Sequence, residues 1–176
     1  LTPPLDDDTV TDQEAQVTIE IYHASKFGNG EMVAQEIKRV LESKGHQVSV
    51  HHIDEVKAKD VPPAELYIFG SPTRFGGPIG GMKRFLKKAA LPPGSRYAVF
   101  ATHGAAAPDK KTGRVPTDEE MARLRRTIPI MDAILAEKGL AKVAEQRFLV
   151  TGDQMKGRLT EGWQDLAERF ATAVIT

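Results

Sequence analysis

The stretch VTIEIYHASKFGNGEMVAQEI, residues 17–37, joins two patterns of different period through a short polar loop. Residues 17–22 are rich in β-branched and apolar side chains, which is typical of a strand. From Glu31 to Lys44, apolar residues recur at helical spacing, and Gly45 ends the pattern. A strand followed directly by a helix predicts one unit of a parallel α/β sheet. The loop from His23 to Gly30 would then follow the carboxyl end of a strand, where ligands bind in such sheets.

The same alternation continues along the rest of the chain. We expect strands at residues 17–22, 48–53, 65–70, 96–102 and 147–152, and helices at 31–44, 82–89, 130–140 and 161–175. Five strands separated by helices predict a doubly wound α/β fold. The third run, ELYIFG, is continuously apolar, which indicates a strand buried on both faces.

The length of 176 residues predicts one domain, which we place at residues 17–176. Residues 1–16 form a polar, acidic lead-in that we expect to be flexible, and we interpret its DDD run at 6–8 as a solvated tail. No metal site is predicted. Residues 105–127 form an insertion longer than an ordinary connection, within which Thr117 and Glu120 predict the capping box of a short helix. This insertion is either functional or a plain surface excursion.

Composition excludes several classes of function. Lys plus Arg and Asp plus Glu number 24 each, so there is no electrostatic reason to expect a nucleic acid or an anionic membrane as partner. No apolar run is long enough to span a bilayer. The chain has no Cys, which excludes disulfides, thiolate catalysis and iron–sulfur clusters and fits a cytoplasmic protein.

The first candidate loop, HASKFGNGE, opens a helix. Amide groups at a helix N-terminus lack internal partners, and the helix dipole there favours an anion. Gly28 and Gly30 let the backbone come close to a ligand, although neither a Walker loop nor a GxGxxG pattern is present. From the residues alone, the loop is either a phosphate cradle or a plain turn.

Two further loops, GSPTRFGGPIGG and ATHGAAAPD, follow the third and fourth strands. Thr73, Arg74 and Phe75 offer a hydroxyl, a guanidinium and a ring to the edge and face of a planar heterocycle, unless Phe75 lies in the core of a Gly/Pro-rich turn. His103 is either a ligand contact or a turn histidine.

Three other aromatic side chains are interpreted as structural. His51 and His52 end the second strand, where we expect them to lie far from the site and to have a structural role. Trp163 has helical core spacing, and we expect it in the core rather than as a cofactor platform.

In combination, these loops resemble those of the flavodoxin-like FMN-binding proteins. SKFGNGEMVA resembles their phosphate loop, and GSPTRFGGPIGGMKRFL resembles the loop over the isoalloxazine ring, with most likeness to the tryptophan-repressor-binding-protein type of NAD(P)H:quinone reductase. The resemblance begins at about Val17 and leaves out the insertion. It implies a five-stranded parallel sheet in the order 2-1-3-4-5.

The resemblance also implies a role for individual residues. The phosphate would be held by Ser25, Phe27, Gly28, Asn29 and Gly30, the flavin would be lined by Pro72, Thr73, Arg74, Phe75 and Gly76, and its other side would be closed by Thr102, His103 and Gly104. Arg74 and His103 are the candidate catalytic residues, Arg74 as a charge near the flavin edge and His103 as a charge or proton shuttle. Electron-carrying flavodoxins have hydroxyl residues where this chain has Phe27 and Gly30. The lost hydroxyl at Gly30 would weaken FMN binding by up to about 1.5–3 kcal/mol.

Three functions follow. The first is an FMN-dependent reductase that takes electrons from NAD(P)H and passes them to a quinone or similar small acceptor. The second is an electron carrier for redox protein partners, although such carriers tend to be acidic and this chain is neutral. The third is a non-redox domain that has lost FMN. The quinone-reductase resemblance also implies a homo-oligomer.

Overall fold

Five parallel strands form the centre of the computed structural model, which describes residues 15–152 and 155–176. They are β1 (Thr18–His23), β2 (Gln47–His52), β3 (Leu66–Arg74), β5 (Arg96–Gly104) and β6 (Ala141–Val150), in the spatial order β2-β1-β3-β5-β6. A two-residue strand, β4 (Gly77–Pro78), pairs antiparallel with the end of β3. Counting the parallel strands alone, this is the expected order 2-1-3-4-5. The DDD run and residues 1–14 of the expected lead-in lie outside the described residues.

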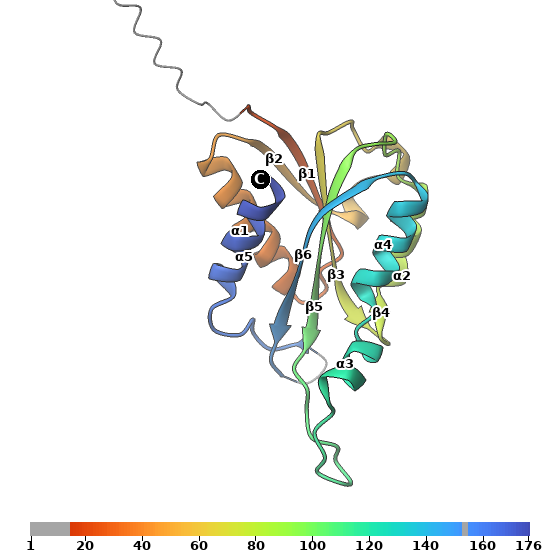
Figure 1. Cartoon of the computed structure of the whole chain (residues 1–176), viewed down its shortest axis with the longest axis vertical. Helices are drawn as coiled ribbons and strands as arrows, with labels where there is room; N and C mark the ends of the chain where they lie inside the picture. Colours follow the sequence, from red (N-terminus) through yellow and green to blue (C-terminus); the bar gives the residue numbers. More distant parts are fainter. Residues whose placement is uncertain (1–14, 153–154) are drawn as a thin grey trace, which may run out of the picture.

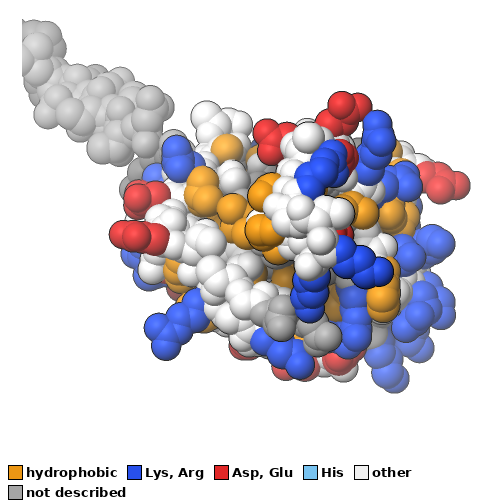
Figure 2. All heavy atoms as spheres, turned by 90° about the horizontal axis from the view of Figure 1, so that it is seen from below, with side chains coloured by type: hydrophobic (Ala, Val, Ile, Leu, Met, Phe, Trp, Pro, Cys, Tyr) orange, Lys and Arg blue, Asp and Glu red, His pale blue; other side chains and the backbone are white. Residues whose placement is uncertain are grey.

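Helices cover both faces of the sheet (Figure 1). α1 (Asn29–Ser43) and α5 (Trp163–Val174) pack on one face, and α2 (Gly80–Lys88) and α4 (Thr127–Glu137) pack on the other. The shorter helices are η1 (Ile53–Glu55), η2 (Ala58–Asp60) and α3 (Asp118–Leu124). The carboxyl ends of the parallel strands lie at the lower edge of Figure 1, which is the edge that faces the viewer in Figure 2. Within the described ranges, no helix is long and apolar enough to cross a membrane.

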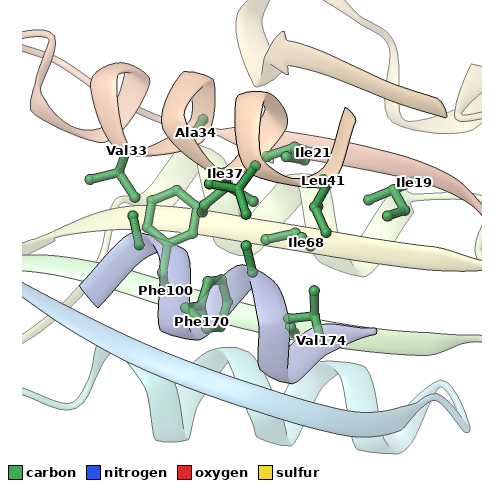
Figure 3. Packing of buried hydrophobic residues seen from close by; sticks show 14 of the residues in the cluster. Ile19, Ile21, Val33, Ala34, Ile37, Leu41, Ile68, Phe100, Phe170 and Val174 are labelled. Carbon is green, nitrogen blue, oxygen red and sulfur yellow. The ribbon is translucent and has the colours of Figure 1, made fainter. Parts of the chain in front are cut away.

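Two hydrophobic clusters fill the space between sheet and helices. On the α1 and α5 face, the cluster in Figure 3 includes Ile19, Ile21, Val33, Ile37, Leu41, Ile68, Phe100, Phe170 and Val174. On the other face, the cluster includes Tyr22, Tyr67, Phe69, Val99, Phe85, Leu86, Met131 and Leu135. Successive residues of β3 therefore enter opposite clusters, which confirms that this strand is buried on both faces.

Gly70 permits the closest crossing in the core. It pairs in register with Phe100 of β5, and the Phe100 ring lies over the Gly70 backbone. A Cβ atom at Gly70 would lie 2.0 Å from Cζ of Phe100. The Phe100 ring also makes edge-to-face contacts with Phe148 and Phe170, at centroid distances of 6.1 and 6.4 Å, and these contacts restrict its movement away from Gly70. A side chain at position 70 would therefore separate β3 from β5.

Three elements differ from the sequence prediction. β3 continues four residues past Gly70, because the Ser71 hydroxyl accepts a hydrogen bond from the Ile79 amide at 3.1 Å and closes a hairpin with β4. β6 begins at Ala141 rather than Arg147, and its first residues lack the apolar pattern because they lie on the exposed edge of the sheet. α4 begins at Thr127, so that Pro129 lies in its first turn, where the missing amide hydrogen costs nothing.

The insertion contains the predicted short helix, α3. The Thr117 hydroxyl accepts from the Glu120 amide at 3.2 Å, as the capping box requires. The reciprocal half of the box is absent, because the Glu120 carboxylate pairs with the guanidinium of Arg114 instead. This ion pair joins α3 to the turn at 109–114, which is closed by a hydrogen bond from the Asp109 amide to the Arg114 carbonyl at 2.9 Å.

Replacing Gly70 with Ala is expected to destabilise the protein by about 1–3 kcal/mol, the range typical of overpacking a core. Equilibrium unfolding in urea measures this change. The double variant Gly70→Ala/Phe100→Leu is expected to recover part of the loss, because the smaller side chain removes the clash with the new methyl group.

Gly80→Ala is the matched control. Gly80 is the first residue of α2, and a Cβ there would lie in ordinary contact, 3.6 Å from Nη1 of Arg84. The substitution is expected to be neutral or mildly stabilising. Equal destabilisation by both Gly→Ala changes would show that the Phe100 crossing is not the reason for Gly70.

Candidate functional site

A cleft of about 310 Å³ opens at the carboxyl edge of the sheet, at the lower end of the volumes of about 300–1,000 Å³ that are usual for ligand pockets. Its lining comprises Ser25, Lys26, Phe27, Asn29, Gly30, Pro72, Thr73, Arg74, Phe75, Ile79, Thr102 and Met155. Nine of these belong to the predicted FMN site: the structure brings together Ser25, Phe27, Asn29, Gly30, Pro72, Thr73, Arg74, Phe75 and Thr102. Gly28, Gly76, His103 and Gly104 are not among the lining residues.

The loop from Ser25 to Gly30 presents backbone amides at the start of α1. Gly28 precedes the helix with φ 94°, a left-handed conformation that favours glycine. Its amide donates to the Ser25 hydroxyl at 3.1 Å, which curls the loop back on itself. Within residues 15–152 and 155–176, the amides of Asn29 and Gly30 have no hydrogen-bond partner. These donors and the positive end of the helix dipole together suit an anion.

Two histidines hold the backbone of Ser25. The Ser25 amide donates to Nδ1 of His23 at 3.2 Å, and the Ser25 carbonyl oxygen lies 2.8 Å from Nε2 of His52. Nδ1 of His52 accepts from the Asp54 amide at 3.0 Å, so Nε2 of the neutral ring carries the proton and donates to Ser25. The two rings also meet edge to face at 5.1 Å. The expectation that His52 lies far from the site is therefore wrong, because β2 pairs with β1 and ends beside the loop.

Burial lowers the pKa of His23 below its ordinary value of 6.5, and the neighbouring His52 acts in the same direction. The carboxylates of Glu31 and Glu55 oppose this shift only in part. His23 is consequently neutral near pH 7, as an acceptor of the Ser25 amide must be.

Gly30 and Asn29 pack the loop against its surroundings. A Cβ at Gly30 would lie 3.3 Å from Cβ of Ser25. Glycine suits this position because the start of α1 approaches Ser25 closely. The Asn29 side chain donates to the Gly157 carbonyl at 3.1 Å and so fastens the loop to Gly157, which follows β6 in the chain. Met155, which also follows β6, reaches the cleft.

The turn between β3 and β4 carries an exposed aromatic ring. Phe75 and Gly76 have φ values of 50° and 78°, as in a type I′ hairpin turn. The Phe75 side chain is 99% exposed, which excludes the alternative that it lies in the core. The Arg74 guanidinium lies 5.8 Å from the ring centroid. On the other side of the cleft, Phe27 is 56% exposed beside the ammonium group of Lys156. Two rings thus flank the mouth of the cleft.

The end of the insertion is attached to the site. The Arg126 amide donates to the Gly76 carbonyl at 2.7 Å, and the Arg125 guanidinium donates to the Gly104 carbonyl at 2.8 Å. The hydroxyl groups of Thr73 and Thr127 are 2.7 Å apart. Residues 124–127 therefore brace two of the three predicted loops, whereas residues 105–116 extend away from the sheet (Figure 1).

His103 points away from the cleft. It is adjacent to Thr102 on β5, and adjacent residues of a strand project from opposite faces. Its ring is only 4% exposed; Nδ1 lies 3.2 Å from the Gly104 carbonyl, and Nε2 is buried without a partner among the described residues. Burial lowers the pKa of the imidazole, and the charges of Arg125 and Arg147 act in the same direction. A catalytic role for His103 stays a prediction, and nothing in this position supports it.

Several residues at the site lay outside the sequence prediction. They are Lys26, Ile79 and Met155, which line the cleft, and His23 and His52, which hold Ser25. The glycines of TGDQMKG, residues 151–157, are the signal that could have located Met155, since this segment follows a parallel strand as the other loops do. Trp163 is half-buried at the edge of the core, as expected, and lines a shallow groove with Phe27.

A sequence model of the flavodoxin family matches residues 21–106. The match runs from within β1 to just past the end of β5 and so includes the first two predicted loops and residues 101–106 of the third. Comparison with curated protein sequences finds no match.

Solved structures of flavodoxins share the fold. The flavodoxin of Streptococcus pneumonia TIGR4 superposes with a TM-score of 0.63 at 23% identity, covering 89% of this chain and 97% of that one. Flavodoxin 2 of Bacillus cereus gives 0.65 at 21% identity, with 91% and 97% covered. A flavodoxin WrbA-like protein from Agrobacterium tumefaciens gives 0.57 at 15% identity, with 90% and 94% covered. The protein thus has a flavodoxin-like fold, and its residues 21–106 match the flavodoxin family model.

Proposed function

We propose that the cleft binds FMN and that the protein is an FMN-dependent oxidoreductase. The observation that carries this proposal is the loop 25–30. It ends in amides that have no hydrogen-bond partner among the described residues, at the start of α1, and it faces the exposed turn of β3 across the cleft. A phosphate fits the amides, and a planar ring fits the space between Phe27 and Phe75. The match to the flavodoxin family supports the same cofactor.

The residues divide the work of binding as follows. Phosphate would be held by the amides of the loop Ser25, Phe27, Gly28, Asn29 and Gly30. The ring would lie against Pro72, Thr73, Arg74 and Phe75, with Thr102 on the β5 side. Contacts of Gly76 and Gly104 with the ring stay predictions, whereas His103 points away from the cleft. Bound FMN would supply one- and two-electron redox chemistry. A positive Arg74 near the ring edge would favour electron uptake, and Thr102 closes the floor of the cleft at 2% exposure.

For the electron donor and acceptor, we propose NAD(P)H and a quinone or similar small acceptor. The aromatic Phe27 in the phosphate loop and the cleft mouth open to solvent support this choice. An electron carrier for protein partners is the second candidate, which is favoured by four basic side chains along a groove beside the cleft: Arg74, Lys83, Arg123 and Arg126. Cytoplasmic location and a homo-oligomer stay predictions.

FMN is expected to bind to the purified protein in a 1:1 ratio, with quenching of flavin fluorescence as the measure. Replacing Phe75 with Ala removes an exposed ring from the cleft wall and is expected to weaken FMN binding about three- to tenfold, the effect of one lost aromatic contact. Val115→Ala, an exposed apolar change in the distal insertion, serves as control and should leave affinity unchanged. Absence of FMN binding by the unmodified protein would reject the proposed cofactor.

Adding NADH or NADPH without oxygen is expected to bleach the visible absorbance of the FMN-loaded protein, and a quinone should then restore it. Dithionite provides the control that the flavin is reducible. If dithionite bleaches the flavin and neither nicotinamide does, the donor is not NAD(P)H and the carrier function is favoured.

Acid is expected to weaken FMN binding through His23. Because folding lowers the pKa of His23, the neutral ring is favoured in the folded state, and its contribution is complete above pH 6.5. The contribution is lost as pH falls through the folded pKa, because a protonated Nδ1 cannot accept the Ser25 amide. The loss of this hydrogen bond corresponds to about 0.5–1.5 kcal/mol, or about two- to tenfold in affinity.

Two variants separate this effect from titration of the FMN phosphate itself. Asn at position 23 offers an acceptor that does not titrate, so His23→Asn should bind FMN normally at pH 7.5 and lose less affinity at pH 5.5. His23→Leu should bind weakly at both values. Identical pH profiles for the unmodified protein and His23→Asn would show that His23 does not govern the loop.

A further inference from the structure

A basic groove lies beside the cleft and shares Arg74, Phe75 and Ile79 with it. The groove encloses about 620 Å³ between the β3–β4 turn, the start of α2 and the junction of α3 with α4. Its lining includes four cationic side chains: Arg74, Lys83, Arg123 and Arg126. Among the described residues, none that lines the groove is acidic.

The positive charge continues along α2. This helix has the sequence GGMKRFLKK, with Arg84, Lys87 and Lys88 exposed and no carboxylate. We call the seven side chains Arg74, Lys83, Arg84, Lys87, Lys88, Arg123 and Arg126 the cationic surface. Figure 2 shows Lys and Arg gathered on the right, over the side that α2 occupies in Figure 1.

These cations are not neutralised by neighbours in the described part of the chain. Of the seven, only Arg123 forms an ion pair with another described residue, with Glu119 at 3.1 Å. Both side chains of this pair are well exposed. The whole chain has no net charge, so the cationic surface is a local asymmetry rather than a property of a basic protein. Such an asymmetry attracts an anionic partner and orients it before contact.

The extent of the surface favours a protein over a single small anion. It covers a turn and parts of two helices, and at its centre Phe75 and Leu124 are 99% and 58% exposed. An apolar, aromatic centre with a charged rim is the usual composition of a protein interface. A partner seated there would also cover the cleft mouth, because both are bounded by the same turn.

We propose that the cationic surface is the docking site of an acidic electron-transfer protein. The docking itself follows from the charges, whereas electron exchange rests on the proposed FMN site. In that exchange the redox centre of the partner would lose one electron, and FMN bound in the cleft would gain it. No atom would be transferred. The proximity of the groove to the cleft shortens the path between the two centres.

The test uses a small acidic [2Fe–2S] ferredoxin as probe and titration calorimetry as measurement, with the protein both free of FMN and loaded with it. Ferredoxin is expected to bind, with weaker binding as salt rises from 20 to about 200 mM, because salt screens exposed charges. Lys83→Glu/Lys87→Glu should raise the Kd at least about tenfold, since it places like charges across the contact. Neither side chain lines the cleft, so FMN affinity should be unchanged.

Lys38→Glu/Lys44→Glu is the matched control, with the same change of charge at Lys38 of α1 and at Lys44, which directly follows α1 on the opposite face of the sheet. It should change the Kd for ferredoxin by no more than about twofold, because a distant exposed charge is screened by salt. Absence of ferredoxin binding, or equal losses in both double variants, would overturn the proposal. So would tighter binding to single-stranded DNA or to vesicles containing phosphatidylserine than to ferredoxin. Ferredoxin binding in a protein that fails to bind FMN would keep the docking site and reject the proposed function.

Discussion

The lateral pairing of β1, β3 and β5 fixes where the three predicted loops of the site can lie. His23 pairs in register with Gly70, and Pro72 pairs with Thr102, so the three strands end close together at one edge. Since the chain leaves each parallel strand at that edge, the three loops meet without needing long-range contacts of their own. The crossing of Phe100 over Gly70 holds β3 and β5 at the distance this register requires. The cleft is a consequence of the sheet.

The same geometry explains how far the sequence could predict the site. The alternation of strands and helices followed from the period, and the three loops followed from the rule that ligands bind beyond strand ends. The strand order and the nine cleft residues followed only from the resemblance to FMN-binding proteins. Applied to β2 and β6 as well, that rule would have located His52 and Met155. The direction of His103 was out of reach, because it depends on β5 continuing past Thr102 to Gly104. The continuation of β3 depends on a tertiary hydrogen bond, from Ile79 to Ser71, which leaves no periodic pattern.

Net charge was the least informative quantity at the sequence level. A balance of 24 basic and 24 acidic residues was an argument against an electron carrier, which would be expected to present an acidic surface. In the structure, the cations of α2 and of the β3–β4 turn lie together beside the cleft, and no acidic residue in the described part of the chain lines the groove. Partners respond to the potential at the contact rather than to the total, because charges beyond about 8–10 Å are screened at physiological salt. A chain without net charge can therefore still use charge to guide docking, here through a basic surface rather than the acidic surface expected of an electron carrier.

The β3–β4 turn borders both the cleft and the basic groove. Phe75 has a positive φ and lies almost wholly in water, two features that each cost free energy in the absence of a ligand or partner. The turn is braced from behind by Arg126 and Thr127, so the ring is held out rather than free to fold inward. One ring then serves two surfaces, as a wall of the cleft and as the centre of the groove. If both proposals hold, a change at Phe75 should affect both cofactor and partner, whereas changes on α2 should affect the partner alone, and this difference makes the two proposals separable.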